Sequence, residues 1–87
     1  MIISSRKTVD TEPALICAQK DNRCRVMITT DRGGHISIGG QDLNRDNGFI
    51  IDDGILSIDG NAAKEEIFAV SARGLRATVY VMEFIEE

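Results

Sequence analysis

The clearest indication of the fold lies near the end of the chain, where residues 77–85 read Ala-Thr-Val-Tyr-Val-Met-Glu-Phe-Ile. Residues of these types favour β-strands, in which successive side chains point to opposite faces. Apolar residues fall on both faces: Val79, Val81 and Ile85 on one, and Tyr80, Met82 and Phe84 on the other. Such a strand is either central and covered by residues 1–13, or in contact with something outside the monomer.

Six shorter runs earlier in the chain share this composition, and turn residues separate them at intervals of about 8–12 residues. The runs are residues 14–19, 25–30, 35–38, 49–51, 55–58 and 66–72. One segment competes with the pattern, because Asn61 is a good N-cap residue and residues 61–67 could begin one helical turn. The pattern as a whole predicts an all-β fold, a small antiparallel β-sandwich or barrel of about seven to eight short strands.

Turn residues between these runs predict β-hairpins. The three candidate turns are Asp21-Asn22, Arg32-Gly33-Gly34 and Asp53-Gly54. With the first two turns in place, Leu15 and Ile38 both lie opposite Ile28 on one buried face. Five pairs, one of them the Asp53-Gly54 turn, are expected to supply positive-φ positions for tight turns: Gly39-Gly40, Asn47-Gly48, Asp53-Gly54, Asp59-Gly60 and Arg73-Gly74.

The predicted pairing also bears on the two cysteines. It makes Cys17 and Cys24 diagonal neighbours on one face, about 7 Å apart, which disfavours a disulfide. We therefore expect two reduced thiols that act as small core hydrophobes rather than a bond or a reactive site. Two cysteines, even together with the lone His35, are too few for a four-ligand zinc site.

The chain of 87 residues is long enough for one domain, and residues 14–87 hold all the predicted strands. Residues 1–13 differ from the rest. An apolar start is followed by a polar stretch and then by Pro13, which prevents regular strand pairing at its own position. We expect an extended N-terminal arm that either lies on a neighbouring subunit or a host surface, or frays.

The charge balance argues against two classes of partner. Lys and Arg number 10 and Asp and Glu 14, a formal net charge of −4, without a basic stripe. Nucleic-acid binding normally requires such a stripe, so we expect no nucleic-acid partner. The apolar runs are far shorter than the ~20 residues that span a bilayer, so we expect no membrane association. The chain starts without a signal-peptide core, so we expect synthesis in the cytoplasm without export.

No group of residues has the pattern of a catalytic or cofactor site. His35 follows two glycines at a predicted turn, which makes it a surface residue, and no serine or cysteine motif stands near it. The paired glycines open no helix, so they are not phosphate-binding loops. Oxygen-rich loops hold calcium in some proteins, but the aspartates of the middle third have the wrong spacing and are ordinary turn residues. They are Asp42, Asp46, Asp52, Asp53 and Asp59. We expect no enzyme, no cofactor and no metal.

Three segments follow one another in a suggestive order. They are Ile36-Ser37-Ile38-Gly39-Gly40-Gln41-Asp42, then Asn47-Gly48-Phe49 with Ile51, Gly54, Leu56 and Ile58, and finally Ile67-Phe68-Ala69-Val70-Ser71. In order and spacing they resemble small β-rich virion proteins of tailed phages, over about residues 14–85. Each of these segments, taken alone, is also common in sequences that form β-turns. The resemblance therefore depends on the order and spacing of the segments. Ala72-Arg73 and the acidic end, with Glu83, Glu86 and Glu87, depart from the pattern.

The resemblance implies a non-enzymatic particle component, a head decoration (cement) protein or a head or tail accessory module. Its partners would be the major capsid protein and copies of itself, as a homotrimer, and its location the virion, assembled in the host cytoplasm. Holding shell subunits together requires only burial at their junction, about 800 Å² per partner. The candidate contact residues lie in the arm and on the last strand: Ile2, Ile3, Arg6, Lys7, Pro13, Tyr80, Met82 and Phe84.

Two other functions are open on the sequence. One is a sugar-binding module on a tail or baseplate, against which the low aromatic content argues, because sugar sites usually expose Trp or Tyr and the chain has only Tyr80. The other is a small regulatory or antitoxin-like protein. Such a protein would form a soluble dimer, bind one defined partner and have no affinity for capsid shells.

Overall fold

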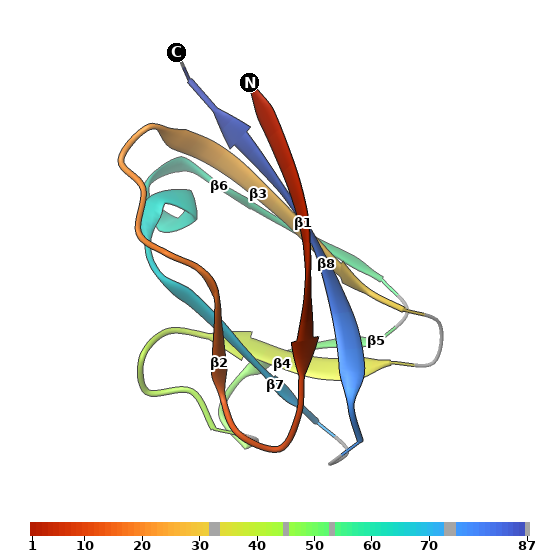
Figure 1. Ribbon diagram of the computed structural model, residues 1–87. Helices are drawn as coiled ribbons and strands as arrows, with labels where there is room; N and C mark the ends of the chain where they lie inside the picture. The colour runs from red at the N-terminus through yellow and green to blue at the C-terminus, as the bar shows by residue number, and fades with distance from the viewer. Residues whose placement is uncertain (32–33, 45, 53, 73–74, 87) are drawn as a thin grey trace.

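The computed structural model describes residues 1–31, 34–44, 46–52, 54–72 and 75–86 and shows two antiparallel sheets packed face to face (Figure 1). Sheet A has the strand order β1-β8-β3-β6, and sheet B the order β2-β7-β4-β5. The strands of sheet A are β1 (Ile2–Val9), β8 (Ala77–Ile85), β3 (Arg23–Thr30) and β6 (Ile55–Asp59). Those of sheet B are β2 (Ala14–Cys17), β7 (Ile67–Ser71), β4 (His35–Gly39) and β5 (Phe49–Asp52). The prediction of a small all-β sandwich is confirmed.

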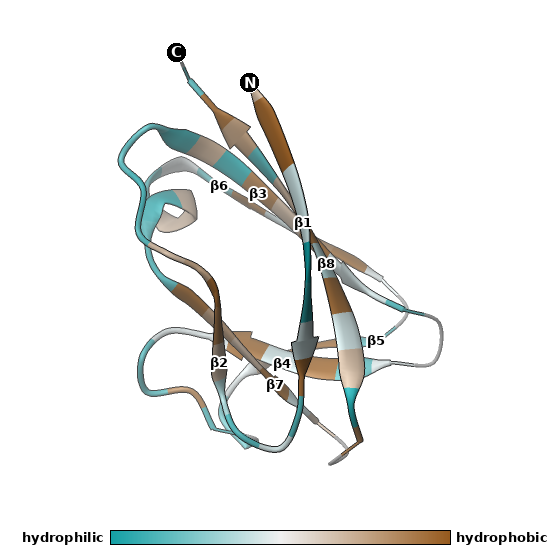
Figure 2. Ribbon diagram, viewed as in Figure 1, coloured by the Kyte–Doolittle hydropathy of each residue, from teal (hydrophilic) through white to brown (hydrophobic). Residues whose placement is uncertain are grey.

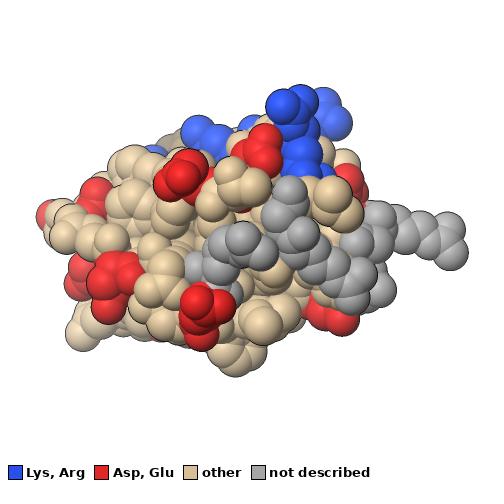
Figure 3. Space-filling model, turned by 90° about the horizontal axis from the view of Figure 1, so that it is seen from below, with Lys and Arg blue, Asp and Glu red and all other residues tan. Residues whose placement is uncertain are grey.

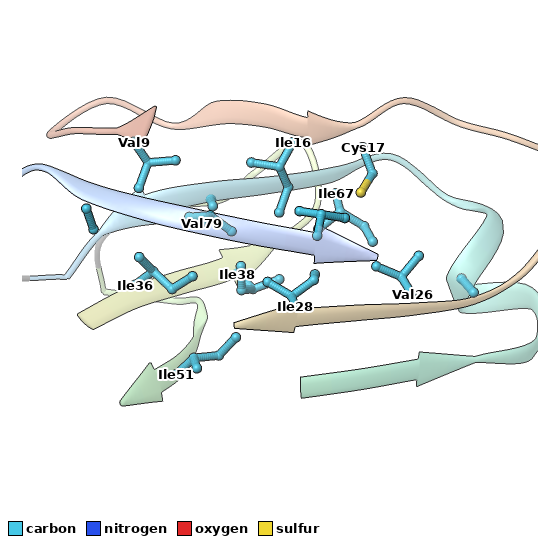
Figure 4. Close-up of a cluster of buried hydrophobic side chains, with 14 residues drawn as sticks. Val9, Ile16, Cys17, Val26, Ile28, Ile36, Ile38, Ile51, Ile67 and Val79 are labelled. Carbon is cyan, nitrogen blue, oxygen red and sulfur yellow. The ribbon is translucent and has the colours of Figure 1, made fainter. Parts of the chain in front are cut away.

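The hydrophobic core lies between the sheets, where inward-facing aliphatic side chains of both meet (Figure 4). Val26 and Ile28 of sheet A are fully buried, and so is Ile36 of sheet B. Each buried side chain of this kind contributes about 1.5–3 kcal/mol by leaving water. Polar residues prevail in the connection between β2 and β3 (Figure 2). The alternation of apolar and polar residues thus selects the face of each strand that enters the core.

The last strand, β8, is central in sheet A, between β1 and β3. On its inner face Val79 and Val81 are buried, whereas Tyr80 and Met82 on its outer face are each 39% exposed. The sandwich therefore covers one apolar face of β8 and leaves the other in contact with solvent.

Residues 1–13 do not form the free arm that the sequence indicates. Ile2–Val9 pair with β8 along the whole length of β1, and Val9 is buried in the core. Pro13 lies beyond the end of β1, in the connection to β2, so its missing N–H costs this pairing nothing. β1 is an edge strand of the same sandwich, and the two ends of the chain lie side by side (Figure 1).

The predicted hairpins are wrong. β2 pairs with β7, β3 with β8 and β6, and β4 with β7 and β5, and β5 and β6 belong to different sheets. Ile28 lies opposite Val81 and Leu56. Alternation determines which residues face the core but not which strand lies alongside, and here most successive strands cross from one sheet to the other. The proposed turn residues that fall outside the described residues are Arg32, Gly33 and Asp53.

A short 3₁₀ turn, η1 (Gly60–Lys64), links β6 to β7, with Asp59 as its N-cap residue where the sequence predicts Asn61. Among the described glycines Gly60 alone has a positive φ, 70°, which confirms the expected role of the Asp59-Gly60 pair. The same expectation is wrong for Gly39, Gly40, Gly48 and Gly54. The predicted Arg73-Gly74 turn lies outside the described residues. In the described ranges, no helix is long and apolar enough to cross a membrane.

Candidate binding surface

The outer face of sheet A carries apolar side chains from three neighbouring strands. Strand pairing places the outward residues in rows across the sheet. One row runs Ser4, Met82, Met27 and Ser57 from β1 to β6, and the next runs Arg6, Tyr80, Thr29 and Ile55. The middle of this face therefore combines two methionines, a tyrosine and an isoleucine.

Except for Arg6 and Ser57, the residues of these rows line a groove of about 350 Å³, which we call the outer groove. Its apolar wall includes Met27, Ile55, Tyr80 and Met82. Ile55 is 66% exposed, and Met27 is half-buried. Methionine adapts to irregular surfaces, and tyrosine joins a large apolar area to a polar tip, so both are enriched where proteins meet.

A charged pair lies beside the outer groove in the adjacent row. The guanidinium of Arg25 lies over the ring of Phe84, 5.9 Å from the ring centroid. Its Nε donates a hydrogen bond to Oδ1 of Asp59 at 2.5 Å. That hydrogen bond, and then the charge of Asp59, raise the pKa of Arg25. The apolar groove thus has a charged rim, the arrangement found around the core of many interfaces.

The eight predicted contact residues separate into two groups. Five share the outer face of sheet A: Ile2, Arg6, Tyr80, Met82 and Phe84. Ile3 and Lys7 alternate to the opposite side of β1, and Pro13 is exposed in the connection to β2. The sheet therefore brings together the three residues of the last strand with two of the five expected from the arm.

Met27 and Ile55 also line the outer groove, and the sequence analysis missed them. Met27 stands between Val26 and Ile28, so the alternation already places it on the face opposite the core. Its neighbours on that face depend on β3 lying between β8 and β6. The predicted hairpins assigned β3 different neighbours and so concealed the groove.

Arg23, which is fully buried, is a further residue that the sequence analysis missed. Its guanidinium donates hydrogen bonds to the carbonyl oxygens of Ala18, Ala63 and Glu65, and to Oε1 of Glu83 at 2.7 Å. These partners belong to the β2–β3 connection, to η1 and the residue after it, and to β8. Arg23 therefore ties the loops at this end of the sandwich to sheet A.

Both cysteines are free, but they lie in different sheets, Cys17 at the end of β2 and Cys24 in β3. Burial, followed by the negative charge of Glu83, raises the pKa of Cys17 to about 11. The Cys17 thiol is therefore protonated at neutral pH, which makes it a poor nucleophile. Sγ of Cys24 donates a hydrogen bond to the carbonyl oxygen of Phe84 at 3.3 Å.

His35 begins β4 rather than lying in a surface turn, and its side chain is only 13% exposed. Its Nδ1 lies 3.2 Å from Oδ1 of Asp52 on the neighbouring strand. Within the part of the chain that the structure describes, no three His, Cys, Asp or Glu side chains come together as a possible metal site. Asp53, one of the aspartates considered for calcium, lies outside that part.

Charged side chains are unevenly distributed over the surface. In the view of Figure 3, Lys and Arg gather along one margin, whereas Asp and Glu are scattered over the face. One ion pair among exposed side chains joins Arg76 to Asp10, with Nε of Arg76 3.6 Å from Oδ2 of Asp10. The described residues on this face form no broad basic stripe of the kind that follows a nucleic-acid backbone.

The chain matches no family model, no curated protein and no solved structure. The resemblance to phage virion proteins therefore rests on the order of residues in the sequence alone. Function is accordingly inferred from the surface chemistry of the described residues.

Proposed function

We propose that the protein is a non-enzymatic binding protein that attaches to a larger protein assembly through the outer groove. The observation that carries this proposal is the groove itself, walled by Met27, Ile55, Tyr80 and Met82. Alkyl, thioether and phenol groups favour burial against another protein, at about 25 cal/mol per Å² of apolar surface removed from water. Exposed apolar surface of this kind, bordered by polar residues, is typical of an interaction site.

The proposed assembly is the capsid shell of a tailed phage, with the major capsid protein as the partner. The order of residues that resembles virion proteins supports this choice, and assembly in the host cytoplasm is part of the proposal. A rigid sandwich that presents one apolar face suits repetition around a symmetric shell, where many weak contacts act together. A standard contact of about 800 Å² per partner has room for the groove and its rim.

The rim supplies orientation rather than most of the affinity. Arg6 lies opposite Tyr80 on one side of the groove, and the Arg25–Asp59 pair lies on the other. Charges at the edge of an interface steer association and reject wrong partners, whereas the desolvated centre determines how slowly the complex dissociates. We propose that the protein also binds copies of itself.

Met82→Lys tests the role of the outer groove. Met82 is 39% exposed in the middle of the groove, so lysine should be accommodated by the folded monomer but should bring an unpaired charge into the contact. We expect binding to expanded capsid shells of the phage that encodes the chain to weaken at least ~10-fold, which corresponds to 1.4 kcal/mol. Co-sedimentation over a range of protein concentrations measures this affinity.

Leu75→Lys is the matched control, because Leu75 is 70% exposed and lies outside the lining of the groove. It adds the same charge and should bind shells like the wild type. Equal shell binding by the wild type and Met82→Lys would show that the groove is not the contact. Binding to a glycan, without binding to any shell, would favour the sugar-binding alternative.

A further inference from the structure

Sheet A ends at two edge strands, β1 and β6, and β6 is the less protected of the two. In the described residues β6 pairs only with β3, so one side of its backbone has no strand partner. An unpaired edge presents a row of N–H and C=O groups that can pair with another strand. Ile55, at the start of β6, is 66% exposed.

The core is incomplete along β6. Leu56 and Ile58 point toward the core cluster and pack against it, but they are only partly buried. The edge of sheet B lies nearby, where Phe49 and Ile50 of β5 are 64% and 58% exposed. Residues of β5 and β6 together line a second groove of about 260 Å³. This side of the sandwich therefore has apolar residues that additional contacts would bury.

Charge distinguishes the two edges of sheet A. β1 carries Arg6 and Lys7, both exposed, and charges of this kind discourage pairing between identical edges. β6 carries one charged residue, Asp59, which already accepts a hydrogen bond from Arg25 of its own chain. Two β6 edges can therefore approach each other without bringing unpaired like charges together.

We propose that two copies of the chain form a dimer by antiparallel pairing of β6 with β6 about a two-fold axis through Ser57. In this register Ser57 of each copy faces Ser57 of the other, and Leu56 faces the second copy's Ile58. The pairing joins inward residues to inward residues, so both cores extend across the junction. Closed two-fold pairing of one self-complementary surface is the commonest form of oligomer.

In the dimer, the four-stranded sheet A of one copy and that of the other join into one continuous sheet. Pairing supplies hydrogen bonds to the open side of β6 and covers the partly buried Leu56 and Ile58. The outer faces of the two copies then lie on the same side of that sheet, which presents two outer grooves side by side. This inference goes beyond the proposed function, and the dimer does not depend on shell binding.

Charge substitutions at Ser57 test the register. Ser57 is exposed, so either sign of charge should leave the folded monomer intact. Directly opposed side chains in an antiparallel pair lie about 5 Å apart, where like charges repel. We expect Ser57→Lys and Ser57→Glu each to raise the dimer dissociation constant at least ~10-fold, and an equal mixture of the two to recover dimer. Light scattering after size exclusion separates the monomer of 9.5 kDa from a species of twice that mass.

Ser4→Lys is the matched control, because Ser4 is an exposed serine on the outer face of β1, at the opposite edge of sheet A. It should remain dimeric at the concentrations at which Ser57→Lys is monomeric. Circular dichroism of each variant shows whether the β structure is intact. A wild-type protein that is monomeric or trimeric at ~100 µM, or a Ser57→Lys variant as dimeric as the wild type, would overturn the proposal.

Discussion

Arg23→Met is expected to lower the free energy of unfolding by about 3–5 kcal/mol. The methionine side chain is unbranched and fills part of the space of the arginine side chain, but it donates no hydrogen bond. The change leaves the carboxylate of Glu83, whose side chain is 14% exposed, without its partner at 2.7 Å. It also removes the donors to the carbonyl oxygens of Ala63 and Glu65. Urea denaturation at a fixed protein concentration measures the loss.

Arg25→Met is the matched control for this change, two residues along the same strand. Arg25 also binds a carboxylate, that of Asp59, but both side chains are more than half exposed, so its loss should leave the urea midpoint almost unchanged. Combining Arg23→Met with Glu83→Gln should recover part of the stability, because no charge then remains unpaired. Similar midpoints for Arg23→Met and Arg25→Met would contradict the buried position of Arg23.

Gly48→Ala is expected to lower the free energy of unfolding by about 1–3 kcal/mol. A Cβ at this position would lie 2.7 Å from Cβ of Ser37 and 2.6 Å from Cδ1 of Leu43. Leu43 is 6% exposed and lies close to both Gly39 of β4 and Gly48, so Gly48 lies where there is no room for a further carbon atom. The terminal carbon of Leu43 can move aside, but Ser37 is held in the middle of β4. Thermal and urea denaturation should both show the loss.

Gly54→Ala is the control for the glycine substitution. No heavy atom lies within 4 Å of the Cβ that alanine would add at Gly54. Its stability should equal that of the wild type or exceed it by up to ~1 kcal/mol, because alanine restricts the unfolded chain. If Gly48→Ala were as stable as Gly54→Ala, the loop that carries Leu43 would not pack against β4 as described.

The positions of the strands follow from local pattern, and their neighbours do not. The run expected at residues 77–85 coincides with β8, because alternating β-branched and aromatic residues act over a few positions. Strand neighbours depend on how two sheets close over one core. Turn residues such as Asp21-Asn22 indicate a change of direction but not the sheet that the next strand joins.

The same distinction between local pattern and strand neighbours explains which residues of the candidate site could be predicted from the sequence and which could not. Tyr80, Met82 and Phe84 stand out in the sequence because they make the second face of one strand apolar. Met27 joins them only through the pairing of β3 with β8. The burial of Arg23 depends on Glu83, which is 60 residues away along the chain, and no local pattern carries that information.

Hydroxyl-radical footprinting of the shell-bound protein tests the central claim most directly, because it reports which side chains lose contact with water. We expect the oxidation rates of Tyr80 and Met82 to fall several-fold on binding to capsid shells, while that of Leu75, outside the outer groove, stays the same. Unchanged oxidation of Tyr80 and Met82 in a saturated shell complex, with protection elsewhere on the surface, would contradict the outer groove as the binding surface.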